Sequence, residues 1–130
     1  MRTIKFRGQD IDDGEWLYGD LRQRIGYWPA IIESYCTDEG KVGYREIAVK
    51  EDTVGQFTGL KDKNGTDIYE GDILKAGSEK AKIEVRFVRG VFAFLWNGDL
   101  DDEFPCNAPT QEWAEVVGNI HDNPKMIKRR

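Results

Sequence analysis

Residues 54–74 constrain the fold of this chain more than any other stretch, because four glycines divide them into short segments. They contain an Asn64-Gly65 pair, a strong short-range signal for a hairpin turn between two strands. They close with a Gly71-Asp72 turn that leads into an apolar strand. We expect all four of these turn residues to be structural, because an Asp in a turn readily accepts backbone N–H bonds. The pattern predicts extended segments joined by glycine turns, as in a small barrel.

The rest of the chain predicts mostly strands and turns. At the N-terminus, Ile4 and Phe6 alternate with polar residues, which indicates a half-buried strand. Further strands are predicted over residues 16–21, 28–32, 44–49, 72–75, 83–87, 91–96 and 113–120. Near the C-terminus, Asn123 followed by Pro124 is typical of a helix start, with Asn as the N-cap and Pro at the first helical position.

The predicted fold class is mostly β, with an N-terminal β unit, a small SH3-like barrel-type unit and a short C-terminal helix. The 130 residues suit one domain, residues 1–130, with enough buried area for a core. Within it we expect sub-units at 1–60 and 66–120, divided near Lys61 to Thr66, where the chain turns.

Composition excludes several classes of protein. The net charge is −5 and is spread over both halves of the chain, which disfavours non-specific binding to nucleic acid. No apolar run approaches the ~20 residues of a membrane-spanning helix, and the N-terminus carries no signal-peptide pattern. Cys36 and Cys106 stand far apart and outside any Cys-x-x-Cys pair, so no zinc or thioredoxin-like motif is present. We expect a cytoplasmic protein with two free thiols.

Three segments resemble one protein family. Residues 54–65, continuing through 68–73, resemble the core motif of the YopX family of phage and prophage proteins. Residues 4–8 resemble that family's opening strand, and residues 117–124 resemble its Gly-Asn-Ile … Asn-Pro terminus. The resemblance implies a mostly-β protein that is encoded by a phage or an integrated element and located in the cytoplasm of a bacterial host. It implies no catalytic residues.

Two acidic segments raise the question of a metal site. The segment that begins at Asp62 is similar to the start of a calcium loop, but an EF-hand needs Gly at position 6 and Glu at position 12. Here those positions hold Asp67 and Ile73, so a turn is preferred. Residues 99–103 contain four carboxylates that magnesium or manganese would accept as ligands. A solvated loop is the preferred interpretation of this cluster, and a small metal enzyme is the alternative.

No catalytic constellation is evident in the sequence. His121 is the only histidine, and neither a Gly-x-Ser-x-Gly nucleophile motif nor a P-loop appears. We therefore expect a non-enzymatic protein with no catalytic residues, no cofactor and no metal.

The remaining candidate is a local patch of basic and aromatic side chains, namely Arg22, Arg24, Tyr27 and Trp28. Aromatic rings beside arginines stack single-stranded bases, although core packing accounts for most aromatic residues in such a chain. Uncovered sheet edges also invite strand pairing. We therefore predict a self-associating protein-interaction module, a homo-oligomer that also has host or phage proteins as candidate partners. The alternative is a nucleic-acid-binding accessory protein, and no membrane association is expected.

Overall fold

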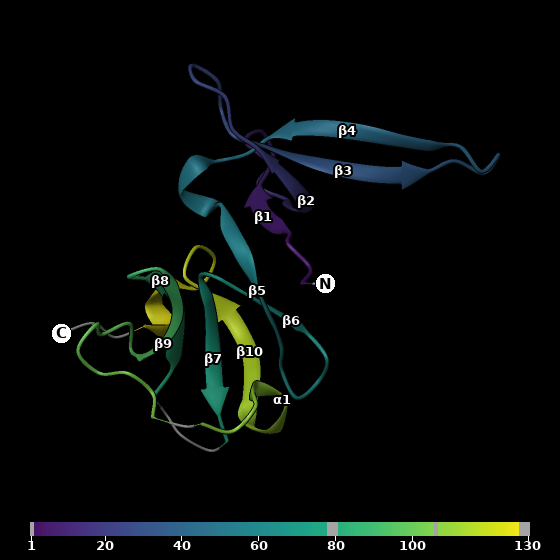
Figure 1. The fold of residues 1–130 in the computed structure, drawn as a ribbon. Helices are drawn as coiled ribbons and strands as arrows, with labels where there is room; N and C mark the ends of the chain where they lie inside the picture. The colour runs from purple at the N-terminus through teal and green to yellow at the C-terminus, as the bar shows by residue number, and fades with distance from the viewer. Residues whose placement is uncertain (1, 78–80, 106, 128–130) are drawn as a thin grey trace. The chain divides into compact units, whose positions relative to one another are not determined.

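The computed structural model describes residues 2–77, 81–105 and 107–127 (Figure 1). The elements in chain order are β1 (Phe6–Gln9), β2 (Trp16–Arg22), β3 (Ala30–Cys36), β4 (Val42–Ala48), η1 (Glu51–Thr53), β5 (Gly55–Lys61), β6 (Asp67–Tyr69), β7 (Asp72–Ala76), β8 (Ile83–Val88), β9 (Val91–Trp96), α1 (Thr110–Trp113), β10 (Ala114–Asn119) and η2 (Pro124–Met126). The predicted mostly-β class is confirmed. The short C-terminal helix is the 3₁₀ turn η2, which Pro124 opens. None of the helices formed by the described residues has the length and apolar character needed to span a bilayer.

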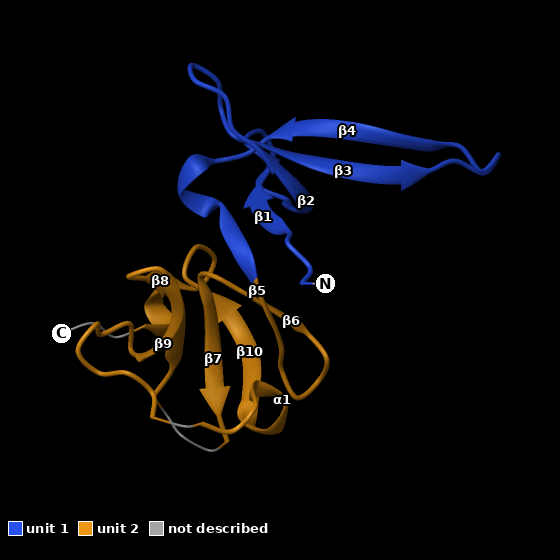
Figure 2. Cartoon of the chain, viewed as in Figure 1, with its two compact units in different colours: residues 1–57 blue, residues 58–130 orange. Residues whose placement is uncertain are grey.

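The chain divides into two compact units, residues 1–57 and 58–130 (Figure 2). Strand β5 begins in unit 1, where it pairs with β1, and its later residues belong to unit 2. The division near Lys61 to Thr66 that the sequence suggested lies a few residues further along the chain.

Unit 1 is an antiparallel sheet in which the strands follow the order β4-β3-β2-β1-β5. Its core consists of Leu17, Ile31 and Val49, which are at most 6% exposed. Phe6, Leu21, Ile47 and Val54 pack around these three residues. The strands of this unit therefore contribute side chains to one apolar cluster, and this cluster packs β2, β3 and β4 together.

The first strand differs from the predicted alternation. Ile4 precedes β1 and is 53% exposed, whereas Arg7 lies within β1 and is only 6% exposed. The Arg7 guanidinium carbon stands 4.7 Å from the centre of the Trp16 ring, on the neighbouring strand β2. Because an aromatic face can cover an arginine, β1 is enclosed on both faces rather than on one.

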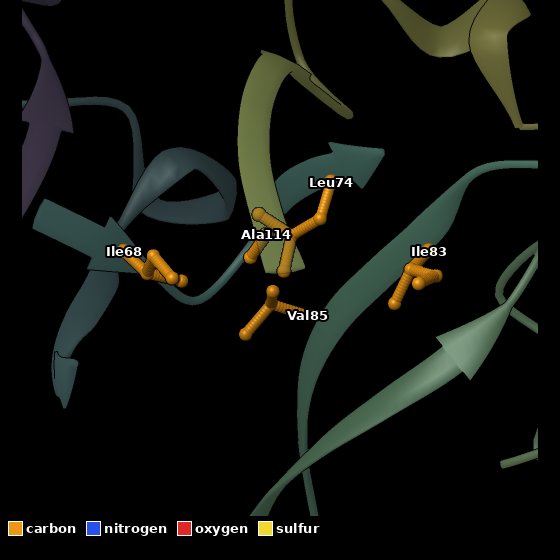
Figure 3. Close-up of a cluster of buried hydrophobic side chains, with 5 residues drawn as sticks. All are labelled: Ile68, Leu74, Ile83, Val85 and Ala114. Carbon is orange, nitrogen blue, oxygen red and sulfur yellow. The ribbon is translucent and has the colours of Figure 1, made fainter. Parts of the chain in front are cut away.

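Unit 2 contains an antiparallel sheet of order β10-β7-β8-β9. Its core is formed by Ile68, Leu74, Ile83, Val85 and Ala114, all fully buried (Figure 3). The β8–β9 hairpin turns at Arg89-Gly90, between the two strands predicted over 83–87 and 91–96, and both residues have positive φ, 52° and 83°. Two consecutive positive-φ residues are the requirement of the tight hairpin turn that matches strand twist.

Four aromatic side chains cover one side of the unit 2 core. The Phe104 ring lies 5.2 Å from the Trp96 ring and 4.4 Å from the Trp113 ring, and Phe94 meets Trp113 edge-on at 6.0 Å. The Trp113 indole N–H donates to the Ala108 carbonyl at 3.0 Å. Core packing therefore accounts for Trp96 and Trp113, two of the four tryptophans. A third, Trp16, has the Arg7 guanidinium over its ring.

Candidate interaction surface

The sequence-predicted patch lies in unit 1, around the loop between β2 and β3. Arg22 Nη1 contacts Glu46 Oε2 at 2.6 Å, and Arg24 Nη2 contacts Glu46 Oε1 at 3.5 Å. Glu46 belongs to β4, which pairs with β3, so the sheet topology brings this carboxylate between the two arginines. One carboxylate thus offsets part of the positive charge that the sequence assigned to this patch.

Three of the four predicted patch residues share one hollow. The Arg24 guanidinium carbon lies 4.6 Å from the centre of the Tyr27 ring, while Tyr27 and Trp28 remain 68% and 62% exposed. The hollow has a volume of about 400 Å³. It is lined by Gln23, Arg24, Gly26, Tyr27, Trp28, Pro29, Glu51 and Val54. Arg22 is not among the lining residues, so the structure separates it from the aromatic pair.

A second hollow adjoins the first through shared residues. Trp28 and Glu51 line both, and the second is completed by Ile11, Lys50 and Asp52. The lining therefore mixes one exposed aromatic ring with side chains of both charges. This composition suits polar contacts of either sign and does not select anions, such as phosphates, over cations.

A larger exposed surface was not singled out in the sequence. We call residues 33–45 the β3–β4 arm; they comprise the distal parts of β3 and β4 and the turn between them (Figure 1). Strand β2 pairs with β3 only at Ala30, Ile31 and Ile32, so β3 and β4 continue beyond it as a two-stranded ribbon. Within the described residues, no other strand borders this part of the ribbon.

The arm exposes apolar side chains on both faces. Tyr35 is 48% exposed, Val42 65% and Tyr44 71%. Across the ribbon, Arg45 Nη2 pairs with Glu33 Oε1 at 2.6 Å, which fastens the two strands together. Tyr35 and Tyr44 are the sequence signal that could have pointed to this surface. The sequence alone does not show that they are exposed, because it does not say which strands lie side by side.

The Asn64-Gly65 turn is organised by a neighbouring carboxylate. Asp62 is 2% exposed, and its Oδ1 accepts the backbone N–H of Asn64 at 2.8 Å and of Thr66 at 2.9 Å. Its Oδ2 accepts the backbone N–H of Val116, on β10, at 2.9 Å. Gly65 has φ +81°, which a residue with a side chain rarely adopts. Asp62 therefore joins the turn to the sheet of unit 2.

The Gly71-Asp72 turn is equally enclosed. Asp72 is 2% exposed, and its Oδ2 accepts the backbone N–H of Tyr69 at 2.7 Å. Gly71 has φ +92° and donates its backbone N–H to the Val85 carbonyl at 2.8 Å. Both predicted turn pairs thus serve the packing of unit 2, and none of their residues lines either of the two hollows described above.

The protonation of Asp62 predicts a pH dependence of stability. Burial raises the pKa of Asp62, but bonds from the Val116, Thr66 and Asn64 backbone N–H groups outweigh it and hold the pKa below the ordinary value. A carboxyl with a lowered pKa in the folded state stabilises the fold above the pKa of the unfolded chain, and this contribution is lost as pH falls through the folded-state pKa.

As the pH is lowered from neutral into the acid range, we therefore expect the unfolding free energy of the wild type to fall more steeply than that of the Asp62→Asn variant. Urea titrations of both proteins across this range measure the two slopes. Equal slopes would show that the Asp62 charge contributes nothing to the pH dependence.

The other polar candidates remain apart. Among the described residues, no three or more His, Cys, Asp or Glu side chains are grouped so as to hold a metal ion. In the acidic segment 99–103, Asp99 Oδ1 accepts the Asp101 backbone N–H at 2.9 Å, as in an ordinary turn. The His121 backbone N–H donates to Asn119 Oδ1 at 3.0 Å. Cys36 is a free, exposed thiol, and Cys106 lies outside the described residues.

Comparison with known proteins supports the resemblance noted in the sequence. No curated protein matches the chain at a significant level. The crystal structure of protein EF1440 from Enterococcus faecalis is similar with a TM-score of 0.58 and 23% sequence identity, over 98% of this chain and 100% of that one. At this identity the likeness concerns the fold alone. The family model described as YopX protein matches residues 5–128. The chain is therefore a member of the YopX family.

Proposed function

We propose that this protein is a non-enzymatic interaction module that associates with further copies of itself through the β3–β4 arm. The observation that carries the proposal is the arm's lack of cover. Val42 and Tyr44 are 65% and 71% exposed, and among the strands that the structure describes only β3 borders β4 at these two positions.

Physical reasoning favours a partner for such a ribbon. An isolated two-stranded ribbon is marginally stable in water, and its open edges present unpaired N–H and C=O groups to other strands. Proteins that remain monomeric usually blunt such edges with charges, prolines or bulges. Strand β4 carries charges at Arg45 and Glu46, but next to the turn it exposes Val42 and Tyr44, and aromatic side chains are enriched at interfaces.

Nucleic-acid binding is the second candidate. Arg24 stacked on Tyr27 beside the exposed Trp28 offers a platform on which a base could stack. Glu46 offsets both arginines, however, and Glu51 lines the same hollow. Together with the net charge of −5, these carboxylates oppose binding to a phosphate backbone. We therefore rank this function below self-association.

The family membership supports a proposal about the setting of the protein. We propose that it is encoded by a phage or prophage and works in the cytoplasm of the bacterial host, where host or phage proteins are further partners for the same arm. The exposed Cys36 thiol supports this setting, because a reducing compartment keeps free thiols reduced.

Self-association can be tested on the full chain by size-exclusion chromatography with light scattering. We expect the parent protein to show a mass of at least about twice that of the 14.9 kDa chain. The Val42→Thr/Tyr44→Thr variant should shift to the monomer mass, because threonine retains strand propensity but removes apolar contact area.

A matched control is Ile25→Thr, which changes an apolar residue that is 102% exposed but lies outside the arm. It should leave the mass unchanged. A parent protein that stays monomeric at every concentration would overturn the proposal, as would a double variant with the parental mass.

A further inference from the structure

We infer that two copies of the chain pair through β4, antiparallel, across a two-fold axis at Tyr44, so that their unit 1 sheets join into one. This inference rests on the proposed self-association and adds to it the strand and the register that the partner uses. The occupant of the open edge is a second copy, because the hydrogen-bonding groups along β4 pair with those of a second β4 about Tyr44, and no like charges then face each other.

The direction of the backbone groups along β4 follows from its pairing with β3. The Thr37 N–H donates to the Lys41 carbonyl at 2.8 Å, at the end of the ribbon that carries the turn. The Val49 N–H donates to the Pro29 carbonyl at 2.9 Å, at the opposite end. Hydrogen-bonded pairs alternate along an antiparallel ladder, so these two bonds place every odd-numbered residue of β4 toward β3.

The even-numbered residues therefore face the open edge. The backbone N–H and C=O groups of Val42, Tyr44 and Glu46 point away from β3, and within the described residues no strand lies beside these three positions on that side. The same edge is closed at its end, where the Ile11 N–H donates to the Ala48 carbonyl at 3.1 Å and Asp10 bridges to Val49. With the two-fold axis at Tyr44, Tyr44 faces Tyr44 of the second copy and Val42 faces its Glu46. Every outward-facing residue of this set then meets another outward-facing residue, and all three pairs form hydrogen bonds.

Neighbouring registers bring like charges together. An axis at Gly43 places Lys41 opposite Arg45 of the second copy, and an axis at Arg45 places the two Arg45 side chains opposite each other. An axis at Glu46 does the same for two carboxylates. Like charges directly opposite each other destabilise strand pairs. If the register shifts by an odd number of residues, backbone groups that face the open edge in one copy lie opposite backbone groups that face β3 in the other. No ladder of hydrogen bonds then forms. The Tyr44 axis avoids all of these conflicts.

The other face of the ribbon fits the same register. Tyr35 lies across Gly43, because a Cβ at Gly43 would fall 2.4 Å from the Tyr35 ring Cζ. In the inferred pair, Arg45 of the second copy stands beside Gly43, next to that ring. Its guanidinium is already held by Glu33 at 2.6 Å and can contact the Tyr35 ring as a cation on an aromatic face. Two-fold symmetry produces this contact twice, and the missing side chain at Gly43 leaves room for it.

Disulfide trapping tests the register directly, in a Cys36→Ser/Cys106→Ser background. Tyr44→Cys should form a covalent dimer as its main species under mild oxidation. Facing residues of a hydrogen-bonded antiparallel pair have Cα atoms about 5.5 Å apart, within the range of a disulfide. Val42→Cys and Glu46→Cys should each remain uncrosslinked alone but form a mixed dimer when combined, with a size tag on one of them to identify it.

Ser34→Cys is the matched control, because Ser34 lies directly opposite Tyr44 on β3, one strand away from the proposed interface. It should not crosslink, and circular dichroism checks that each variant keeps the parental fold. If the background protein is dimeric but Tyr44→Cys does not crosslink, or Val42→Cys crosslinks with itself, the register is overturned while self-association stands. A background protein that is monomeric at every concentration overturns both proposals.

Discussion

Replacing Asp62 by alanine should lower the unfolding free energy of residues 58–130 by roughly 3–5 kcal/mol. Asp62 is 2% exposed and accepts three backbone N–H groups, those of Asn64, Thr66 and Val116, at 2.8–2.9 Å. Alanine leaves these donors without their acceptor, and a buried donor that loses its partner costs about 1–3 kcal/mol. The penalty is large because one side chain holds both a turn and a strand.

Urea unfolding measures the change, and amide hydrogen exchange in β7 and β10 localises it to unit 2. Asp99→Ala is the matched control. Its carboxylate also accepts a backbone N–H, from Asp101 at 2.9 Å, but in an exposed turn where water can replace it. We expect this control to cost less than about 1 kcal/mol. Equal losses in the two variants would contradict the role given to Asp62.

Replacing Gly19 by alanine should disrupt the junction of β2 and β3 and destabilise unit 1 by about 3 kcal/mol or more. A Cβ at Gly19 would lie 2.1 Å from the Ile32 carbonyl oxygen and 3.0 Å from its carbonyl carbon. Both are backbone atoms, so no side-chain rotation relieves the clash. Gly19 stands where β3 leaves β2 and the arm begins, so the variant should also lose self-association.

The control for this clash is Gly26→Ala. Gly26 has φ +81°, but no heavy atom lies within 4 Å of its added Cβ. It should therefore cost only the ~1–2 kcal/mol of a left-handed conformation. Hydrogen exchange in β2 and β3, compared between the two variants, separates the clash from the conformational term. Equal exchange rates would show that the sheet accommodates the extra methyl group.

Turns were predictable because their chemistry is local. An Asn64-Gly65 pair indicates a turn from its own local chemistry, and Gly65 has the expected positive φ, +81°. The enclosure of Arg7 was not predictable in this way. Its cover is the ring of Trp16, on another strand, and residue alternation along one strand carries no information about that ring.

The candidate site shows the same division. The sequence placed Arg24, Tyr27 and Trp28 near one another because they are close along the chain, and they line one hollow. It did not show that Glu46 would offset the positive charge of both arginines, because Glu46 lies on β4 and strand pairing brings its carboxylate beside them. Nor did the calcium-loop comparison show what Asp62 does, since one of its partners, Val116, is remote in sequence.

The sequence by itself determined the mostly-β class, the glycine turns and the family, because turn preferences and motifs are properties of neighbouring residues. Only the tertiary structure decided that β4 is an edge strand, that the β3–β4 arm extends beyond β2, and that Asp62 is buried at the junction of a turn and a sheet. These features depend on which strands lie side by side. Strand neighbours are set by burial and hydrogen bonding between distant segments, which no local pattern records.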